Sequence, residues 1–290
     1  MNILVALPHY FNEVKQSNYG SGREGQKQAR SLALIQCLSS LLALQREEHD
    51  LILNIAKRGI ERTQKSKSKT LLDIHLFTDG EHVLNPVLAI FEKAINVHTM
   101  NLENSRELPL KARDYLINQG HTYDLCLYLE DDLIIRDTEF LKKQHWLIHK
   151  SAHKAVLMPH RTEWVPKAKG QRLIVDGPLR PDFIQRFCKP KLAVARGTYQ
   201  GQREVVFDQT DNPHSGLFCI SGQQAGELAK IAQPNDGFIS PLETAATLTV
   251  LQRYVVLKPS WNDRYFLWVE HGHPSFQGYC TSWPMVGDPL

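Results

Sequence analysis

Short apolar runs and stretches of helical period alternate along the first half of the chain. Apolar runs bounded by polar residues, which are typical of buried strands, occur at residues 2–7, 71–77 and 125–129. Apolar residues recur at helical spacing between and beside them, at residues 26–45, 86–95 and 105–120. This alternation predicts an α/β fold of the doubly wound, nucleotide-binding kind, with a largely parallel sheet covered by helices.

The second half of the chain has a less regular pattern. Residues 161–209 are rich in Pro, Lys, Arg and Gly, which predicts short strands in an insertion or lid region. Ser240, Pro241 and Glu243 form a helix start, in which Ser240 caps and Glu243 holds the third helical position. The other predicted elements are a helix at 138–150, a strand at 154–159, a strand at 217–220 and a helix at 223–232.

Three consecutive carboxylates, Glu130, Asp131 and Asp132, follow the apolar run at 125–129. Ligands of open α/β sheets bind at the carboxyl ends of the strands. Adjacent carboxylates repel one another and are costly to bury alone, so we expect a cation to offset them. If the strand stays extended through the motif, Glu130 and Asp132 project to one side and Asp131 to the other.

Composition narrows the class of protein. The 290 residues are 42% hydrophobic, and 34 Lys and Arg against 31 Asp and Glu give a net charge of +3, which does not favour a nucleic-acid partner. The five cysteines are scattered and never form CxxC, which argues against a disulfide framework and a zinc knuckle and favours a reducing compartment. The amino-terminal run lacks a basic segment before it, and no later run is long enough to span a bilayer. We therefore expect a cytoplasmic protein that is at most peripheral to a membrane.

One basic cluster stands out, KRGIERTQKSKSK at Lys57–Lys69. It is read either as a solvated loop or as a peripheral contact with anionic lipid or a phosphorylated acceptor. The solvated loop is the favoured interpretation.

Taken together, several stretches resemble the GT-A class of nucleotide-sugar-dependent glycosyltransferases. LYLEDDLIIRDTEF is similar to the acidic motif of that class, and its Glu-Asp-Asp-Leu form looks most like the N-acetylglucosaminyltransferase I group. ILVALPHYFN resembles the first strand, and HSGLFCISGQQAGEL with SPLETAATLTVL resembles the acceptor-side elements. In order and spacing the likeness covers most of the chain.

The resemblance implies a single GT-A-like domain over residues 1–290, with a mixed, mostly parallel central sheet. Its donor half covers about residues 1–135 and its acceptor half about residues 136–290. It also implies transfer of a hexosyl or N-acetylhexosaminyl group from a nucleotide-diphosphate sugar to a carbohydrate, lipid-linked or protein acceptor.

The resemblance further implies roles for the carboxylates and for the histidines of VEHGHPSF. Asp132 is expected to bind Mn²⁺ or Mg²⁺, which would neutralise charge on the departing diphosphate. Glu130 and Asp131 are expected to contact donor hydroxyls. His271 or His273 is a candidate for a further metal or diphosphate ligand, although each could equally be structural.

Three residues at the ends of the first two strands complete the predicted donor site. Pro8 and Tyr10 match the end of the first GT-A strand. Asp79, in Thr78-Asp79-Gly80, could contact a base or ribose, or could simply be the turn residue that Asp-Gly favours.

An inverting transfer needs a general base, and the resemblance assigns that role to Glu243. The competing interpretation is a capping box with Ser240, and Asp236 and Asp211 are reserve candidates. Two other functions stay open: a metal-dependent phosphoester hydrolase that uses the same carboxylates and histidines, and a catalytically silent nucleotide-sugar-binding relative.

Overall fold

A five-stranded sheet forms the centre of the protein in the computed structural model, which describes residues 1–13, 23–66, 68–165 and 171–286. Its strand order is β13-β6-β1-β4-β5, and every neighbouring pair is parallel except β13 with β6. The bounds are β1 (Asn2–Pro8), β4 (Leu71–Thr78), β5 (Asn96–Thr99), β6 (Leu125–Leu129) and β13 (Leu217–Ser221). The predicted α/β class, with a mixed and mostly parallel central sheet, is confirmed.

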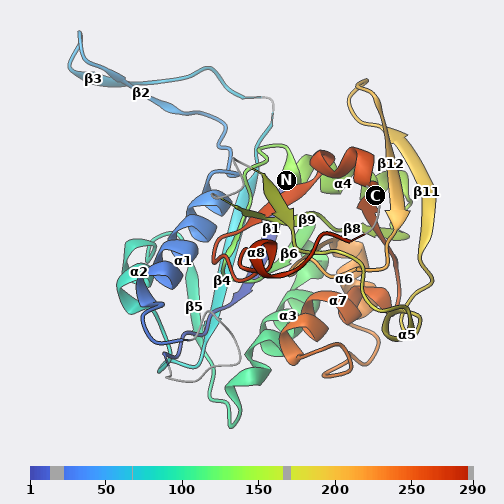
Figure 1. Ribbon diagram of the computed structural model, residues 1–290. Coiled ribbons are helices and arrows are strands. Elements are labelled where there is room, and N and C mark those ends of the chain that lie inside the picture. Colours follow the sequence, from blue (N-terminus) through green and yellow to red (C-terminus); the bar gives the residue numbers. More distant parts are fainter. Residues whose placement is uncertain (14–22, 67, 166–170, 287–290) are drawn as a thin grey trace.

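Helices cover both faces of this sheet (Figure 1). Side chains alternate between the faces of a strand, and β1 shows this clearly: Val5 packs into one apolar core and Leu4 into the other. The first core includes residues of α1 (Lys27–Leu42), α2 (Asn85–Ile90) and α4 (Phe140–Lys150). The second includes residues of α3 (Leu108–Gln119), α6 (Gly222–Leu228) and α7 (Pro241–Leu251). Burial on both faces explains why the central strands are continuous apolar runs.

Two four-stranded sheets are built mainly from the second half of the chain. One has the order β10-β9-β15-β7 and contains β7 (Leu133–Ile134), β9 (His160–Trp164), β10 (Arg172–Ile174) and β15 (Trp268–His271). The other has the order β11-β12-β14-β8 and contains β8 (Ala155–Leu157), β11 (Lys191–Thr198), β12 (Glu204–Gln209) and β14 (Val255–Pro259). Short helices α5 (Pro181–Ile184) and α8 (Tyr279–Ser282) complete this part, with 3₁₀ turns at Ser105–Glu107, Gly120–Thr122 and Trp261–Phe266.

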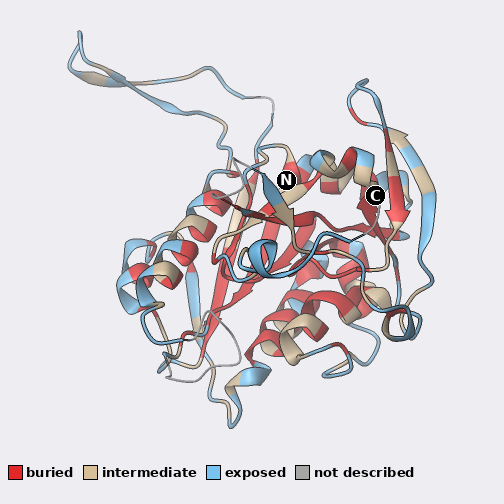
Figure 2. Ribbon diagram, viewed as in Figure 1, coloured by how far each residue is buried: buried red, intermediate tan, exposed pale blue. Residues whose placement is uncertain are grey.

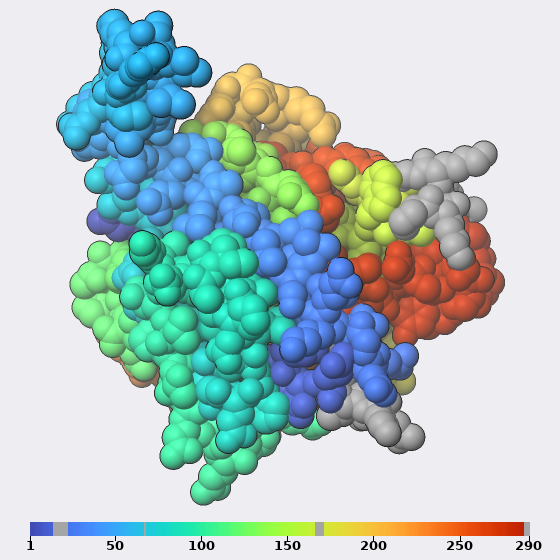
Figure 3. Space-filling model, turned by 90° about the vertical axis from the view of Figure 1, so that its left-hand side faces the viewer, coloured from blue at the N-terminus to red at the C-terminus, as the bar shows by residue number. Residues whose placement is uncertain are grey.

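A separate two-stranded hairpin stands away from the body of the protein (Figures 1 and 3). It consists of β2 (Leu51–Asn54) and β3 (Gly59–Arg62), and most of its residues are exposed (Figure 2). The basic cluster Lys57–Lys69 therefore begins in the turn of a hairpin and runs down its second strand; residue 67 lies outside the described residues.

None of the helices in the described ranges combines the length and the apolar character needed to cross a membrane. The division into a donor half and an acceptor half stays a prediction.

Candidate functional site

The three carboxylates lie where several strand ends meet. β1 and β4 end together, since Pro8 is level with Phe77, and β6 runs parallel to both. β13 begins at the same edge, and the Glu130 backbone N–H donates to the Gly216 carbonyl at 2.9 Å. β15 then brings His271 opposite Leu133. The site is therefore at the sheet edge that the sequence predicts.

The chain turns as soon as β6 ends, so the strand does not stay extended through the motif, and the side-chain alternation that depends on that condition does not apply. The Leu133 backbone N–H donates to the Glu130 carbonyl at 3.2 Å, which closes a tight turn. As a result Asp131 and Asp132 share one cation, the guanidinium of Arg30, and Glu130 contacts a different set of residues.

Asp131 is bound by Arg30 and by an imidazole. Arg30 Nη2 lies 2.6 Å from Asp131 Oδ1, and His9 Nδ1 lies 2.6 Å from Asp131 Oδ2. The Leu84 backbone N–H donates to His9 Nε2 at 3.1 Å, so the ring proton of a neutral His9 is on Nδ1 and donates to Asp131. Burial opposes ionisation of Asp131, but Arg30 and His9 outweigh it and hold its pKa below the usual range.

Asp132 is the second ionised carboxylate, and it faces His271. Its Oδ2 lies 2.9 Å from Arg30 Nη1 and 3.5 Å from His271 Nε2. Burial opposes ionisation, yet the charges of His271 and Arg30 bring the pKa of Asp132 well below its usual range. Desolvation acts against the protonation of His271, but Asp132 and Glu163 raise its pKa to about 9.

Glu163 fixes the orientation of His271. Glu163 Oε1 lies 2.6 Å from His271 Nδ1, and the two carboxylate oxygens also accept backbone N–H groups of residues 275–277. Glu163 is fully buried, so these contacts replace its lost hydration. A carboxylate behind an imidazole is the arrangement that orients metal-binding histidines in proteins.

Glu130 differs from its two neighbours because it holds a proton at neutral pH. Burial, with the nearby charges of Asp132 and Glu243, raises its pKa to about 8, and Arg161 only partly opposes this shift. Glu130 Oε2 lies 3.7 Å from Arg161 Nη1, and Glu130 Oε1 lies 3.9 Å from His214 Nε2. Glu130 Oε1 makes no hydrogen bond with any residue in the described ranges. Gly216, at φ +64°, allows this packing, because a Cβ there would lie 2.7 Å from Glu130 Oε2.

A buried ionic network lies behind Glu130. Asp176 pairs with Arg161 at 2.9 Å and with Lys258 at 3.2 Å, and these cations hold its pKa far below the usual range against the effect of burial. Lys258 Nζ also donates to the His214 carbonyl at 2.6 Å, and burial lowers the pKa of Lys258 to about 8. Burial also lowers the pKa of His214, so its ring is neutral; its Nδ1 lies 2.7 Å from Thr247 Oγ1 on α7.

The two candidate histidines differ in position. His271 contacts Asp132, whereas His273 Nε2 lies 3.0 Å from Gln26 Oε1 and its Nδ1 lies 3.2 Å from Ser275 Oγ. Residues that the structure describes include no group of three or more His, Cys, Asp or Glu side chains arranged to hold a metal ion. Metal binding by Asp132, His271 and His273 therefore stays a prediction.

Glu243 lies in the first turn of α7 and is half-buried. It accepts a hydrogen bond from Ser240 Oγ, which itself accepts from the Leu242 backbone N–H at 3.2 Å. Ser240 caps the helix as predicted. The negative charge of Glu243 contributes to the raised pKa of Glu130.

The predicted nucleotide-side residues lie at the same edge. Pro8 ends β1 and precedes His9. Tyr10 is 37% exposed, and its ring lies 4.8 Å from that of His82. Asp79 accepts the backbone N–H groups of residues 81 and 82 and contacts His82 Nδ1 at 2.7 Å, so it is engaged as a turn residue.

Most of the residues that surround the three carboxylates were not predicted from the sequence. Arg30 had a detectable signal, because it falls in line with Leu34 and Leu38 on the apolar face of α1, where an arginine is unusual. His9 follows the first strand directly. The remaining missed residues, Arg161, Glu163, Asp176, His214 and Lys258, gave no local signal.

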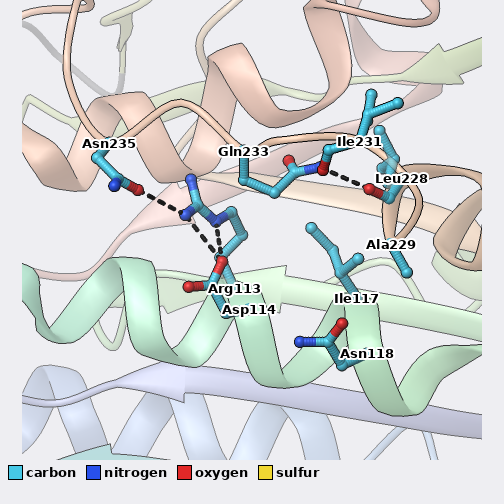
Figure 4. Close-up of a pocket in the computed structure, with 9 residues that line it drawn as sticks. All are labelled: Arg113, Asp114, Ile117, Asn118, Leu228, Ala229, Ile231, Gln233 and Asn235. Atoms are coloured by element: carbon cyan, nitrogen blue, oxygen red, sulfur yellow. Dashed lines mark hydrogen bonds and ion pairs between the residues drawn. The ribbon is translucent and has the colours of Figure 1, made fainter.

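A pocket lies apart from this cluster (Figure 4). It is a cavity of about 300 Å³ beside α3, and Arg113 within it is already held by Asp114 and Asn235. Its lining includes none of the predicted site residues: it consists of Arg113, Asp114, Ile117, Asn118, Leu228, Ala229, Ile231, Gln233 and Asn235.

Comparison with known proteins gave matches among solved structures only; no family model and no curated protein sequence matches the chain. TarS 1-349 from S. aureus in complex with UDP-GlcNAc has 14% identity and a TM-score of 0.45, covering 99% of this chain and 62% of that one. Another structure of TarS 1-349 has 15% identity and a TM-score of 0.43, covering 89% and 58%. GalNAc-T7 with UDP, GalNAc and Mn²⁺ has 12% identity and a TM-score of 0.42, covering 93% and 42%. The chain thus spans less than two thirds of each of these proteins, and scores this low do not establish a shared activity.

The buried proton on Glu130 gives a testable pH dependence. An unfolded glutamate loses its proton near pH 4.5 and folded Glu130 near pH 8, so between these values the folded state binds the extra proton. Stability from this group therefore falls as pH rises through this window, by at most about 1.4 kcal/mol per pH unit. The glutamine of Glu130→Gln cannot ionise. We therefore expect the free energy of unfolding of this variant to rise relative to that of wild type between about pH 5 and pH 8, as measured by urea denaturation with EDTA.

Glu92→Gln, at an exposed glutamate, serves as the matched control. The same pH profile for both variants would contradict a protonated Glu130.

Proposed function

We propose that this chain is a metal-dependent GT-A glycosyltransferase that transfers a sugar from a nucleotide-diphosphate sugar. The observation that carries the proposal is Asp132, an ionised carboxylate at the carboxyl edge of a parallel sheet, with the imidazole of His271 3.5 Å away and oriented by Glu163. The resemblance of the motif suggests the reaction class. An ionised carboxylate beside an oriented imidazole could hold the metal ion that this class needs at that position.

Asp132 and His271 suit Mn²⁺ better than Mg²⁺. At neutral pH the His271 ring carries a proton on Nε2, and Mn²⁺ would have to displace it to bind there. One carboxylate oxygen and one imidazole nitrogen are then a mixed donor set, whereas Mg²⁺ takes oxygen ligands almost exclusively. Two protein ligands are sufficient where substrate phosphates and waters complete the coordination. When bound, the ion would neutralise the charge that develops on the departing diphosphate. His273, farther along the same segment, would be a diphosphate contact.

Arg30 keeps Asp131 and Asp132 ionised and oriented for binding the metal ion and the donor. Its guanidinium bridges Asp131 and Asp132, so both stay ionised although both are buried. The Arg30 fork also fixes the direction of each carboxylate before substrate arrives. Asp131 would then accept hydrogen bonds from sugar or ribose hydroxyls.

Glu130 would contact the donor sugar differently from Asp131. Since it holds a proton, it can donate one hydrogen bond to a hydroxyl oxygen as well as accept one. The neutral ring of His214 lies beside it, with Nε2 3.9 Å from Glu130 Oε1. We place the nucleotide on the other side of the cluster, with the base against Tyr10 and with Pro8 and Asp79 shaping that end of the site.

Glu243 would act as the general base of an inverting transfer. It lies in the first turn of α7, and Ser240 Oγ donates a hydrogen bond to one of its carboxylate oxygens. A half-buried carboxylate near the donor sugar is placed to accept the proton of an acceptor hydroxyl. The acceptor would approach from the side of α7.

Ligand binding provides the first test. With Mn²⁺ and a nucleotide sugar at about 100 times its Kd, binding adds about 2.7 kcal/mol of stability. At roughly 2–4 °C per kcal/mol, we expect a uridine or guanosine diphosphate sugar to raise the melting temperature by several degrees only with Mn²⁺. Asp132→Asn should abolish the rise, whereas Asp137→Asn, at a carboxylate paired with Lys143, should retain it.

No response to any uridine or guanosine diphosphate sugar would count against the proposal. Metal-dependent cleavage of simple phosphoesters without nucleotide-sugar binding would favour a hydrolase instead.

Kinetics test the role of Glu243. Glu243→Gln removes the base but keeps an acceptor for Ser240, so we expect kcat to fall about 10²–10⁴-fold while donor binding is retained. Glu92→Gln, at an exposed glutamate, is the control and should leave kcat unchanged. Ser240→Ala, which removes the helix cap, should lower stability by about 1 kcal/mol. A Glu243→Gln enzyme of normal kcat and lowered melting temperature would show that the residue is structural.

A further inference from the structure

The hairpin of β2 and β3 is a feature that the catalytic proposal leaves unused. Its stem closes where Arg46 and Thr70 exchange backbone hydrogen bonds at 2.8 Å, and the ion pairs of Lys65 with Glu48 and Lys69 with Glu47 lie along it. Beyond the stem, the strands project away from the body (Figures 1 and 3). An isolated two-stranded ribbon is marginally stable in water, so a surface that covers it would stabilise it.

The two faces of this hairpin have opposite character. In an antiparallel pair, residues opposite each other share a face; Leu53 lies opposite Ile60, and Leu51 lies opposite Arg62 two residues away. Leu51, Leu53 and Ile60 therefore form one apolar face, and they are 69%, 68% and 61% exposed. Ile55, in the turn, is 78% exposed.

The opposite face is polar and internally bonded. Glu61 Oε1 accepts from Asn54 Nδ2 and from Lys57 Nζ, each at 2.9 Å. Ile52, opposite Glu61, is the one large apolar residue of this face. The hairpin is thus amphipathic, with its apolar side uncovered, and a cluster of exposed aliphatic side chains of this kind marks an interaction surface.

The charge of the hairpin indicates what covers that face. Residues 51–62 hold three cations, Lys57, Arg58 and Arg62, against the single carboxylate Glu61, a net charge of +2. Arg58 and Arg62 form no ion pair with any residue in the described ranges. Aliphatic side chains next to unpaired cations match the boundary between headgroups and acyl chains of an anionic membrane.

A second copy of the chain fits less well. Two hairpins packed face to face would bring like charges together, and the face offers about four aliphatic side chains where a standard interface uses about 20–30 residues a side. We propose that the hairpin docks the protein on an anionic phospholipid surface, with Leu51, Leu53, Ile55 and Ile60 at the acyl boundary and the cations among the headgroups. This goes beyond the proposed function and does not depend on it.

Vesicle sedimentation of the full chain tests this docking. We expect binding to phosphatidylcholine vesicles that contain phosphatidylglycerol, weak binding to phosphatidylcholine alone, and loss of binding as salt is raised. Leu53→Ser with Ile60→Ser should weaken binding by at least about tenfold. Arg58→Gln and Arg62→Gln should each weaken it about fivefold, because a basic residue near such a surface contributes about 1 kcal/mol.

Ile52→Ser, on the polar face of the same hairpin, is the matched control and should leave vesicle binding within about twofold. A chain in which a short glycine-serine turn replaces residues 51–62 should lose vesicle binding but keep its melting temperature and its response to nucleotide sugars. These readouts separate failure of docking from failure of folding and from failure of the proposed function.

Two results would overturn the proposal. One is a wild-type chain that binds neither type of vesicle, or binds both equally. The other is a dimer in analytical ultracentrifugation that Leu53→Ser with Ile60→Ser dissociates, which would assign the apolar face to a second copy.

Discussion

The structure depends on how three adjacent carboxylates are accommodated in the interior at one sheet edge. Left alone, three such charges would cost far more than a domain of this size can spare. Asp131 and Asp132 stay ionised because Arg30, His9 and His271 surround them. Glu130, which lacks a partner this close, binds a proton instead. One short turn therefore presents two ionised carboxylates and one protonated carboxyl group, and these can act differently on a ligand.

This compensation joins parts of the chain that are far apart in sequence. Arg30 comes from α1, whereas His271 and Glu163 come from the small sheet of β15 and β9. Arg161 is in turn held by Asp176, which Lys258 also contacts. The predicted donor and acceptor halves thus share one electrostatic network, and a change in either half is expected to alter the protonation of the carboxylates. Gly216 leaves room for Glu130 in this network, because a Cβ there would lie 2.7 Å from Glu130 Oε2.

The central sheet was predictable because strands buried on both faces appear as apolar runs, as at 125–129, and because helical spacing marks α1 and α3. The position of Asp132 at the carboxyl edge of the sheet was predictable because it follows such a run. The side chains that stabilise it were not, because contacts such as Glu163 with His271 join residues 108 positions apart in strands with no distinctive local pattern. The apolar face of the hairpin also escaped prediction, since the basic residues of Lys57–Lys69 suggested a loop and the register that aligns Leu53 with Ile60 is a property of the fold.

The central claim is that the carboxylate edge holds a metal ion together with a nucleoside diphosphate, and Asp132 is its essential ligand. Anomalous scattering from crystals soaked in Mn²⁺ and the nucleoside diphosphate that stabilises the protein most tests this directly. We expect one manganese peak within coordination distance of an Asp132 oxygen, with diphosphate oxygens also bound to it. A diphosphate bound elsewhere, or bound at this edge with no manganese beside Asp132, would contradict it.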